Sequence, residues 1–168
     1  AFKENMLGPG VIEKCAALAA QEHGDARRAL DLLRVAAEIG ERENSEKIEE
    51  RHVDMAESKI DNDRIFEIVK SQPRQSQAVL WSVLKMDGEV HTGDIFSIYE
   101  GICSENGLKP LTQRRVSDLI AELDLLGVIN AKVVSKGRYG RTRIIKINLH
   151  SSLVKKIKEI LQTKYYFQ

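Results

Sequence analysis

The sequence predicts a mostly helical protein whose C-terminal part adds a β-hairpin and a closing helix. Apolar residues recur at three- and four-residue spacing over most of the chain, which is the period of an amphipathic helix. Two β-rich segments near the C-terminus flank a glycine-bearing loop, which is typical of a hairpin. The net charge also changes sign near Gln72-Pro73. We therefore expect two domains, a small helical bundle at residues 1–71 and a mixed domain at residues 72–168.

The first half is expected to hold helices only. The first helix begins at Val11, after the Gly8-Pro9-Gly10 turn, and the second runs from Asp25 to near Gly40. A third helix contains Val53–Ala56, and a fourth lies around Ile65–Val69. Asp25 suits the first position of its helix because a carboxylate accepts hydrogen bonds from exposed backbone N–H groups. The charged stretch at residues 41–50 is expected to be a solvated loop.

The second half is expected to hold three helices, a hairpin and a last helix. The helices lie at Gln75–Lys85, from a cap at Thr92 to Asn106-Gly107, and from a cap at Thr112 to Gly127; strands follow at Val128–Ser135 and Thr142–Leu149, and the last helix at Ser152–Gln162. The third helix presents one apolar face, formed by Val116, Leu119, Ile120, Leu123 and Leu126.

The composition fits a protein that folds in water. The chain has 168 residues, of which 42% are hydrophobic and 30% charged. No apolar run approaches the roughly 20 residues that cross a bilayer, and no secretory signal opens the chain, so we expect a cytoplasmic location and no membrane partner. Cys15 and Cys103 lack partners at metal-ligand spacing, which excludes a zinc finger and a disulfide scaffold. We expect no metal site, and no metal or catalytic role for His23, His52, His91 and His150.

The charge is distributed unevenly along the chain. Residues 1–71 hold 16 acidic and 11 basic side chains, whereas residues 72–168 hold 9 acidic and 15 basic ones. No Asp or Glu occurs from Leu125 through Lys158. That stretch carries Lys132, Lys136, Arg138, Arg141, Arg143, Lys146, Lys155, Lys156 and Lys158. Such a positive field predicts that the second half meets a polyanion.

Three helices followed by a hairpin with a basic tip are the element order of a winged helix-turn-helix, in which the third helix enters the major groove of DNA. The candidate DNA-binding residues are Thr112, Gln113, Arg114, Arg115, Ser117, Lys136, Arg138, Tyr139, Arg141 and Arg143. Arginines in a first helical turn are disfavoured by about 0.3–1 kcal/mol each unless a phosphate lies nearby. Glycines around the wing arginines let the backbone approach a surface closely.

Two alternatives to these DNA contacts stay open. Arg114 and Arg115 could pair with neighbouring acids, and the wing could be a solvated loop tip. Asp118 is expected to be a local salt-bridge partner. The basic face of the last helix, formed by Lys155, Lys156 and Lys158, either extends the DNA footprint or is a solvated surface.

The segment Glu22–Arg34, which reads EHGDARRALDLLR, closely resembles the sensor 2 segment in the lid domain of the archaeal and eukaryotic Orc1/Cdc6 replication initiators, which are AAA+ ATPases. The segments Leu111–Ser117 and Lys136–Thr142 look like the third helix and the wing of the archaeal members. The resemblance covers nearly the whole chain. It implies an AAA+ lid at residues 1–71 and a winged-helix DNA-binding domain at residues 72–168.

The resemblance also implies a nucleotide-sensing arginine. In the family, the Gly-Asp-x-Arg motif supplies an arginine that reaches the γ-phosphate of ATP held between the lid and the ATPase core; by position this is Arg27. A guanidinium is always charged and offers fixed donors to phosphate oxygens. Gly24 would permit close approach and Asp25 would start the helix. Arg28 is expected to form ordinary surface pairs with residues such as Asp31.

The sequence departs from the family where ATP would be held. It contains no Gly-x-x-x-x-Gly-Lys-Ser/Thr phosphate loop and no apolar strand ending in paired acids. We therefore expect a fragment without the ATPase core, with no catalytic residue, no cofactor of its own and no enzymatic activity. ATP or ADP and Mg²⁺ belong to the intact protein.

The resemblance implies that the chain recognises duplex origin DNA and takes part in replication initiation and helicase loading. Its implied partners are origin DNA, the replicative MCM helicase and other initiator subunits, at the nucleoid. In a first alternative the winged helix serves mainly to dock the helicase or a second initiator. In a second alternative the chain is a transcription regulator, but a sensor arginine has no use there.

Overall fold

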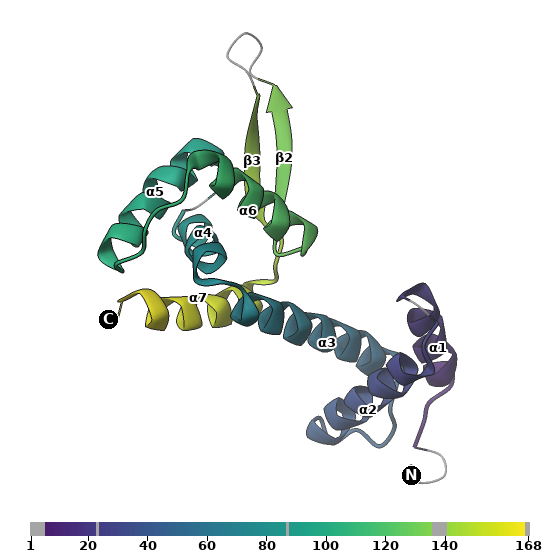
Figure 1. The fold of residues 1–168 in the computed structure, drawn as a ribbon. Helices are drawn as coiled ribbons and strands as arrows, with labels where there is room; N and C mark the ends of the chain where they lie inside the picture. The colour runs from purple at the N-terminus through teal and green to yellow at the C-terminus, as the bar shows by residue number, and fades with distance from the viewer. Residues whose placement is uncertain (1–5, 23, 87, 136–140, 167–168) are drawn as a thin grey trace. The chain divides into compact units, whose positions relative to one another are not determined.

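The computed structural model describes residues 6–22, 24–86, 88–135 and 141–166 (Figure 1). The chain divides into two compact units, Ala1–Arg64 and Ile65–Gln168. This division precedes the predicted boundary after Ser71. The reason is that Ile65, Phe66 and Val69 pack into the core of the second unit.

The first unit contains α1 (Val11–Glu22), α2 (Ala26–Arg42) and the beginning of α3 (Glu50–Ser71). Its core is formed by Val11, Cys15, Leu32, Val35, Ala36, Ile39, Ile48, Val53 and Ala56. Asp25 caps α2 as predicted, because its carboxylate accepts a 2.9 Å hydrogen bond from the Arg27 N–H. The prediction of separate third and fourth helices was wrong. Residues 57–64 contain no glycine or proline, so α3 continues through them.

The second unit contains α4 (Arg74–Leu84), β1 (Val90–His91), α5 (Thr92–Glu105), α6 (Gln113–Leu125), β2 (Ile129–Ser135), β3 (Arg141–Ile147) and α7 (Ser151–Tyr166). The strands form an antiparallel sheet in the order β1-β3-β2. The hairpin register runs from Ile129 opposite Ile147 to Ser135 opposite Arg141. These elements confirm the predicted winged helix-turn-helix. The two-residue strand β1 was not predicted, because it is too short to show an alternating pattern.

The helix α4 lies at the centre of the second core. Every residue from Ser76 to Leu84 is buried, so its side chains pack on all sides of the helix. The predicted apolar face of α6 is confirmed for Val116, Leu119, Ile120 and Leu123. Leu126 is a correction: its side chain is 36% exposed, because α6 ends at Leu125 and Leu126 is the C-cap. Among the described helices, none is long and apolar enough to cross a membrane.

Candidate nucleic-acid interface

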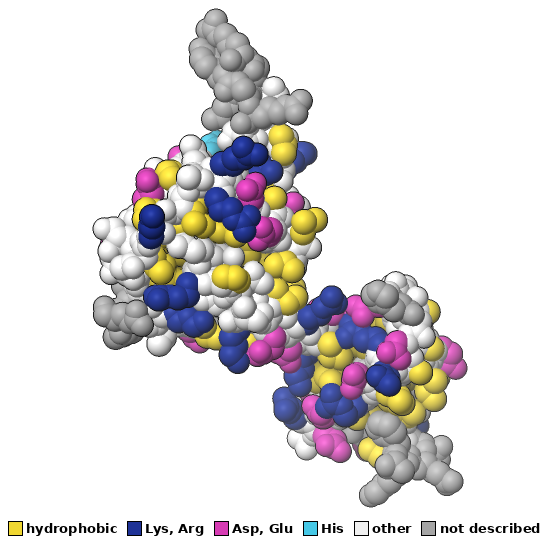
Figure 2. Space-filling view, in the orientation of Figure 1, with side chains coloured by type: hydrophobic (Ala, Val, Ile, Leu, Met, Phe, Trp, Pro, Cys, Tyr) yellow, Lys and Arg dark blue, Asp and Glu magenta, His cyan; other side chains and the backbone are white. Residues whose placement is uncertain are grey.

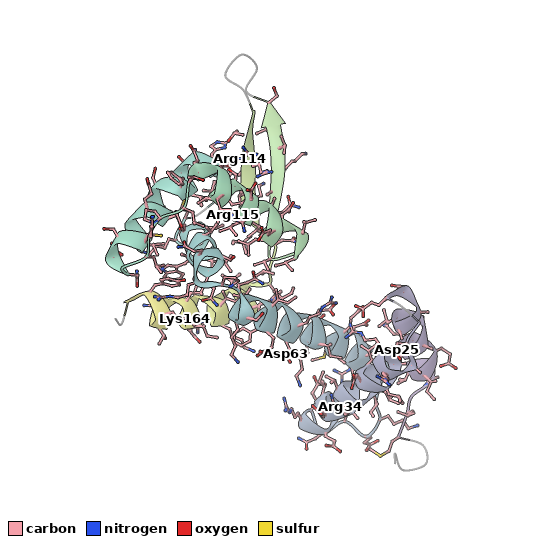
Figure 3. The ribbon with its side chains drawn as sticks, viewed as in Figure 1. Asp25, Arg34, Asp63, Arg114, Arg115 and Lys164 are labelled. Carbon is pink, nitrogen blue, oxygen red and sulfur yellow. The ribbon has the colours of Figure 1, made fainter. Side chains whose placement is uncertain are left out.

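The head of α6 is defined by a side-chain cap. Thr112 precedes the helix with an extended backbone, and its Oγ1 accepts a 3.3 Å hydrogen bond from the Arg115 N–H. Gln113 and Arg114 then occupy the first turn, and both are exposed. The cap therefore confirms the predicted start of the third helix, and two long polar side chains follow it directly. Figure 3 labels one of them, Arg114, at this end of α6.

A groove of about 820 Å³ joins the head of α6 to the head of α5 and to the hairpin strands. It is lined by His91, Thr92, Gly93, Asp94, Gln113, Arg114, Ser117, Val133, Thr142 and Arg143. Predicted residues from the third helix and from the wing strand thus share one open surface. Two helix N-termini also lie at this groove, and the N-terminus of a helix favours negative charge. The lining supplies cations and uncharged hydrogen-bonding groups, with Asp94 as its one acid.

The two neighbouring arginines of α6 differ in their surroundings. Among the described residues, the Arg114 guanidinium has no hydrogen-bonded or ionic partner, and Arg114 lines the groove. The Arg115 guanidinium lies 3.0 Å from the Glu122 carboxylate and 3.9 Å from that of Asp118. Arg115 is thus held along its own helix rather than in the groove lining. Asp118 is the local salt-bridge partner that the sequence predicted.

Arg143 connects the wing strand to the third helix. Its Nη1 donates a 2.8 Å hydrogen bond to the backbone carbonyl of Ser117, and this contact is partly buried. One donor of Arg143 is therefore used inside the protein. The sequence contained no signal for this role, because the two residues are 26 positions apart.

The predicted tip residues Lys136, Arg138 and Tyr139 lie outside the described residues. Arg141 opens β3, where its backbone pairs with that of Ser135. On α7, Lys155 and Lys156 are exposed and Lys158 is half-buried. Figure 2 shows dark-blue Lys and Arg side chains on the second unit, interspersed with magenta acidic ones.

The structure also shows groove residues that the sequence analysis did not propose as DNA contacts. Thr92 and Gly93 form the first turn of α5, which His91 precedes as N-cap, one position before the predicted cap. The Asp94 carboxylate accepts a 3.3 Å hydrogen bond from the His91 N–H. Thr142 and Val133 come from the hairpin strands, and Val133 is 55% exposed. The fold brings these residues beside Arg114. The sequence predicted Thr92 as a helix cap but gave no sign that it lies near Arg114.

In the first unit, Arg27 and Arg28 also lie in different surroundings. Arg27 is exposed, and its guanidinium has no partner among the described residues. Arg28 is held 3.1 Å from the Glu22 carboxylate and 2.9 Å from that of Asp61, so its predicted pairing is confirmed with partners other than Asp31. Gly24 has a φ of +69°, and none of the described residues offers an atom within 4 Å of the position that a Cβ would take. The positive φ, which glycine adopts without strain, explains the glycine here.

Comparisons with known proteins agree with both units. Residues 67–157 match the family described as CDC6, C terminal winged helix domain, and residues 1–58 match the Cdc6 AAA+ ATPase-type lid domain. The chain is 56% identical to the ORC1-type DNA replication protein of Thermococcus onnurineus over 94% of its length, and 52% identical to that of Pyrococcus furiosus over 100%. It spans 39% and 40% of these two relatives.

A solved structure described as the Aeropyrum pernix ORC1 protein in complex with DNA is also similar. It matches 96% of this chain with a TM-score of 0.79 and 43% sequence identity, and the match covers 42% of that protein. The family matches cover most of the sequence, and their order is that of the two units seen here. The chain therefore belongs to the Orc1/Cdc6 family of replication initiators, of which it holds the AAA+ lid and the C-terminal winged helix.

Proposed function

We propose that the second unit binds duplex DNA and contributes to the recognition of replication origins. In this proposal the head of α6 enters the major groove, while β2 and β3 follow the adjacent backbone or minor groove. The observation that carries it is the single groove that Gln113 and Arg114 of α6 share with Thr142 and Arg143 of β3. One duplex could contact both elements at this surface.

The residue types at the groove suit the two kinds of contact that DNA recognition needs. Contacts to phosphates fix the position of the protein, whereas contacts to base edges read the sequence. An exposed arginine can donate two hydrogen bonds to O6 and N7 of guanine, and a glutamine can accept one from N6 of adenine and donate one to its N7. Arg114 and Gln113 are the candidates for these contacts. The similar Aeropyrum pernix ORC1 protein was solved in complex with DNA, which supports DNA as the ligand of this unit.

The wing supplies the decisive test. The paired change Arg138→Ala and Arg141→Ala is expected to weaken duplex binding roughly tenfold or more and to make its salt dependence shallower, because each lost phosphate contact changes the log-log slope by about 0.9. Fluorescence anisotropy with a labelled duplex measures both quantities. Arg34→Ala is the matched control, because Arg34 is an exposed arginine of the first unit whose guanidinium pairs with Asp31 and Glu38. Unchanged duplex binding by the wing variant would favour protein docking instead.

A second candidate function is the docking of a protein partner, and a separate groove favours it. This groove of about 530 Å³ lies between the end of α4, β3 and the beginning of α7. Its lining is mostly apolar and includes Val83, Leu84, Met86, Val90, Ile145, Ile147, Leu149 and Val154. The replicative MCM helicase and a second initiator subunit are the candidate partners. Val154→Asp should abolish binding of purified MCM helicase and leave duplex binding unchanged if this groove is the docking site.

In the intact protein, helicase loading and ATP use would depend on parts beyond these two units. Arg27 fits the role of a phosphate-contacting group because its guanidinium is exposed and has no partner among the described residues. Bound ATP with Mg²⁺ would supply the phosphoryl group to be hydrolysed, and Arg27 would donate hydrogen bonds to it. In an intact ORC1-type protein that carries this lid, Arg27→Ala should lower ATP hydrolysis, whereas Arg34→Ala should not.

A further inference from the structure

Two side chains in the second unit hold the turn that leads into α6. The hydroxyl of Tyr99, a fully buried residue of α5, donates a hydrogen bond to Oε1 of Gln75 in α4. The same hydroxyl accepts a 3.0 Å hydrogen bond from the Leu111 N–H. Nε2 of Gln75 in turn donates a 3.0 Å hydrogen bond to the Lys109 carbonyl. One pair of side chains therefore satisfies two backbone groups of the turn.

These two backbone groups lie on either side of Pro110. A proline has no N–H to donate, and it also restricts the residue before it to an extended backbone. Gln75 binds the Lys109 carbonyl and Tyr99 binds the Leu111 N–H, so the turn is held by hydrogen bonds on both sides of Pro110. Thr112 then caps α6, and the exposed Gln113 and Arg114 follow at once.

Apolar packing alone would position α6 less sharply. The face formed by Val116, Leu119, Ile120 and Leu123 is buried, but apolar burial is not directional and tolerates small shifts of a helix. Hydrogen bonds have preferred distances and angles, so the Gln75–Tyr99 pair restricts where the first turn of α6 can lie. Readout of base edges requires that the contacting groups be held to within about 0.5 Å.

We propose that Gln75 and Tyr99 are positioning residues for sequence readout by α6. They do not line the groove, and neither would contact DNA. They would fix the start of α6 so that Gln113 and Arg114 meet base edges in one register. This inference rests on the proposed DNA-binding function and adds the residues that determine its specificity.

The test compares two tyrosine variants that lose the same chemical group. Tyr99→Phe removes the hydroxyl that holds the turn. Tyr165→Phe is the matched control, because the hydroxyl of this buried residue donates a partly buried 2.6 Å hydrogen bond to the Arg74 carbonyl and, among the described residues, makes no hydrogen bond to the turn. The probes are duplexes selected from a random pool by the unaltered chain, and scrambled duplexes of the same composition. Their ratio of affinities is the measured preference.

Tyr99→Phe should reduce the preference for selected duplexes roughly tenfold, the loss expected for one misplaced base contact. Binding to scrambled duplexes and the salt slope should stay unchanged, because no phosphate contact is removed. The Leu111 amide should exchange its hydrogen faster in this variant. Gln75→Met should lower the preference by the same factor, and the double variant should show no further loss, since both changes break one network.

Three results would overturn the inference. A preference that stays within about twofold in Tyr99→Phe would show that the pair is structural only. An equal loss of preference in Tyr165→Phe would show that general destabilisation is the cause. A chain that binds no duplex at all would overturn the proposed function, and this inference with it. Titration of the unaltered chain shows that failure before any variant is tested.

Discussion

The guanidinium of Arg143 in β3 donates a 2.8 Å hydrogen bond to the backbone carbonyl of Ser117 in α6. This contact ties the strand of the wing to the helix proposed to read DNA. Both residues also line the groove between these elements. Arg143 can therefore act on DNA binding in two ways, by holding the wing against α6 and by placing positive charge at the groove.

Replacing Arg143 with alanine should destabilise the second unit by about 1–2 kcal/mol, because a hydrogen bond from a charged donor is lost at a partly buried carbonyl. Thermal unfolding followed by circular dichroism should show a midpoint lower by several degrees, at about 4–8 °C for each kcal/mol. Lys146→Ala is the control on the same strand, because its ion pair with Glu89 lies at the exposed surface. Equal midpoints for Arg143→Ala and the unaltered chain would contradict the structural role.

Arg114 and Arg115 are adjacent, yet their replacement should have unequal effects. Arg114→Ala should weaken duplex binding by about 1–3 kcal/mol and change either the sequence preference or the salt slope. Arg115→Ala should have a smaller effect, because its guanidinium is already engaged by Glu122 and Asp118. Anisotropy titrations of the two variants in parallel provide the comparison. A larger loss for Arg115→Ala would mean that these ion pairs break when DNA binds.

Thr112→Ala should cost about 1 kcal/mol of stability, the usual value for a lost helix N-cap. The reason is that the Arg115 N–H would lose the Oγ1 acceptor that lies 3.3 Å away. Urea unfolding of the alanine and serine variants measures the loss. The serine variant keeps an Oγ acceptor and should retain most of the stability. If both variants lose the same amount, the cap does not explain the effect.

Alkaline pH should destabilise the second unit through its buried tyrosines. Burial raises the pKa of Tyr99 and of Tyr165 to about 12, because a phenolate is poorly solvated in the core. An unfolded tyrosine loses its proton near pH 10, at about its ordinary pKa. The stabilisation is therefore complete below about pH 10 and is lost as the pH rises towards about 12.

Urea unfolding from about pH 8 to about pH 12 tests this dependence. The double variant Tyr99→Phe/Tyr165→Phe should show a flatter profile, since neither position can then titrate. In the double variant, the absorbance of tyrosinate should also show that two of the tyrosines that lose their proton above the ordinary pKa are missing. A profile as steep as that of the unaltered chain would assign the alkaline loss to other groups.

Local signals in the sequence predicted much of the fold. The caps Asp25 and Thr112 and the apolar face of α6 depend on neighbours within a turn or two, so the spacing of residue types reveals them. The continuity of α3 did not follow, because two apolar clusters separated by polar residues looked like two helices. The strand β1 exists only through its pairing with β3, which lies far along the chain.

The candidate site also combines features that local sequence reveals with contacts between distant residues. Gln113, Arg114 and the wing arginines could be proposed from the sequence, because their residue types and their places in the element order are local features. The contact from Arg143 to Ser117 spans 26 positions, and that from Tyr99 to Gln75 spans 24. Such contacts are set by the packing of elements against one another, so residue patterns within one element cannot predict them.

The winged-helix unit is proposed to bind double-stranded DNA through cations that contact phosphates. The affinity of the unaltered chain for selected and scrambled duplexes, measured between about 50 mM and 200 mM salt, tests this proposal. We expect the logarithm of the binding constant to fall linearly with the logarithm of salt concentration, with a slope of several units, and the selected duplex to bind more tightly throughout. A slope near zero would show that phosphate contacts do not drive binding, and equal affinity for both duplexes at every salt concentration would show that the unit does not read DNA sequence.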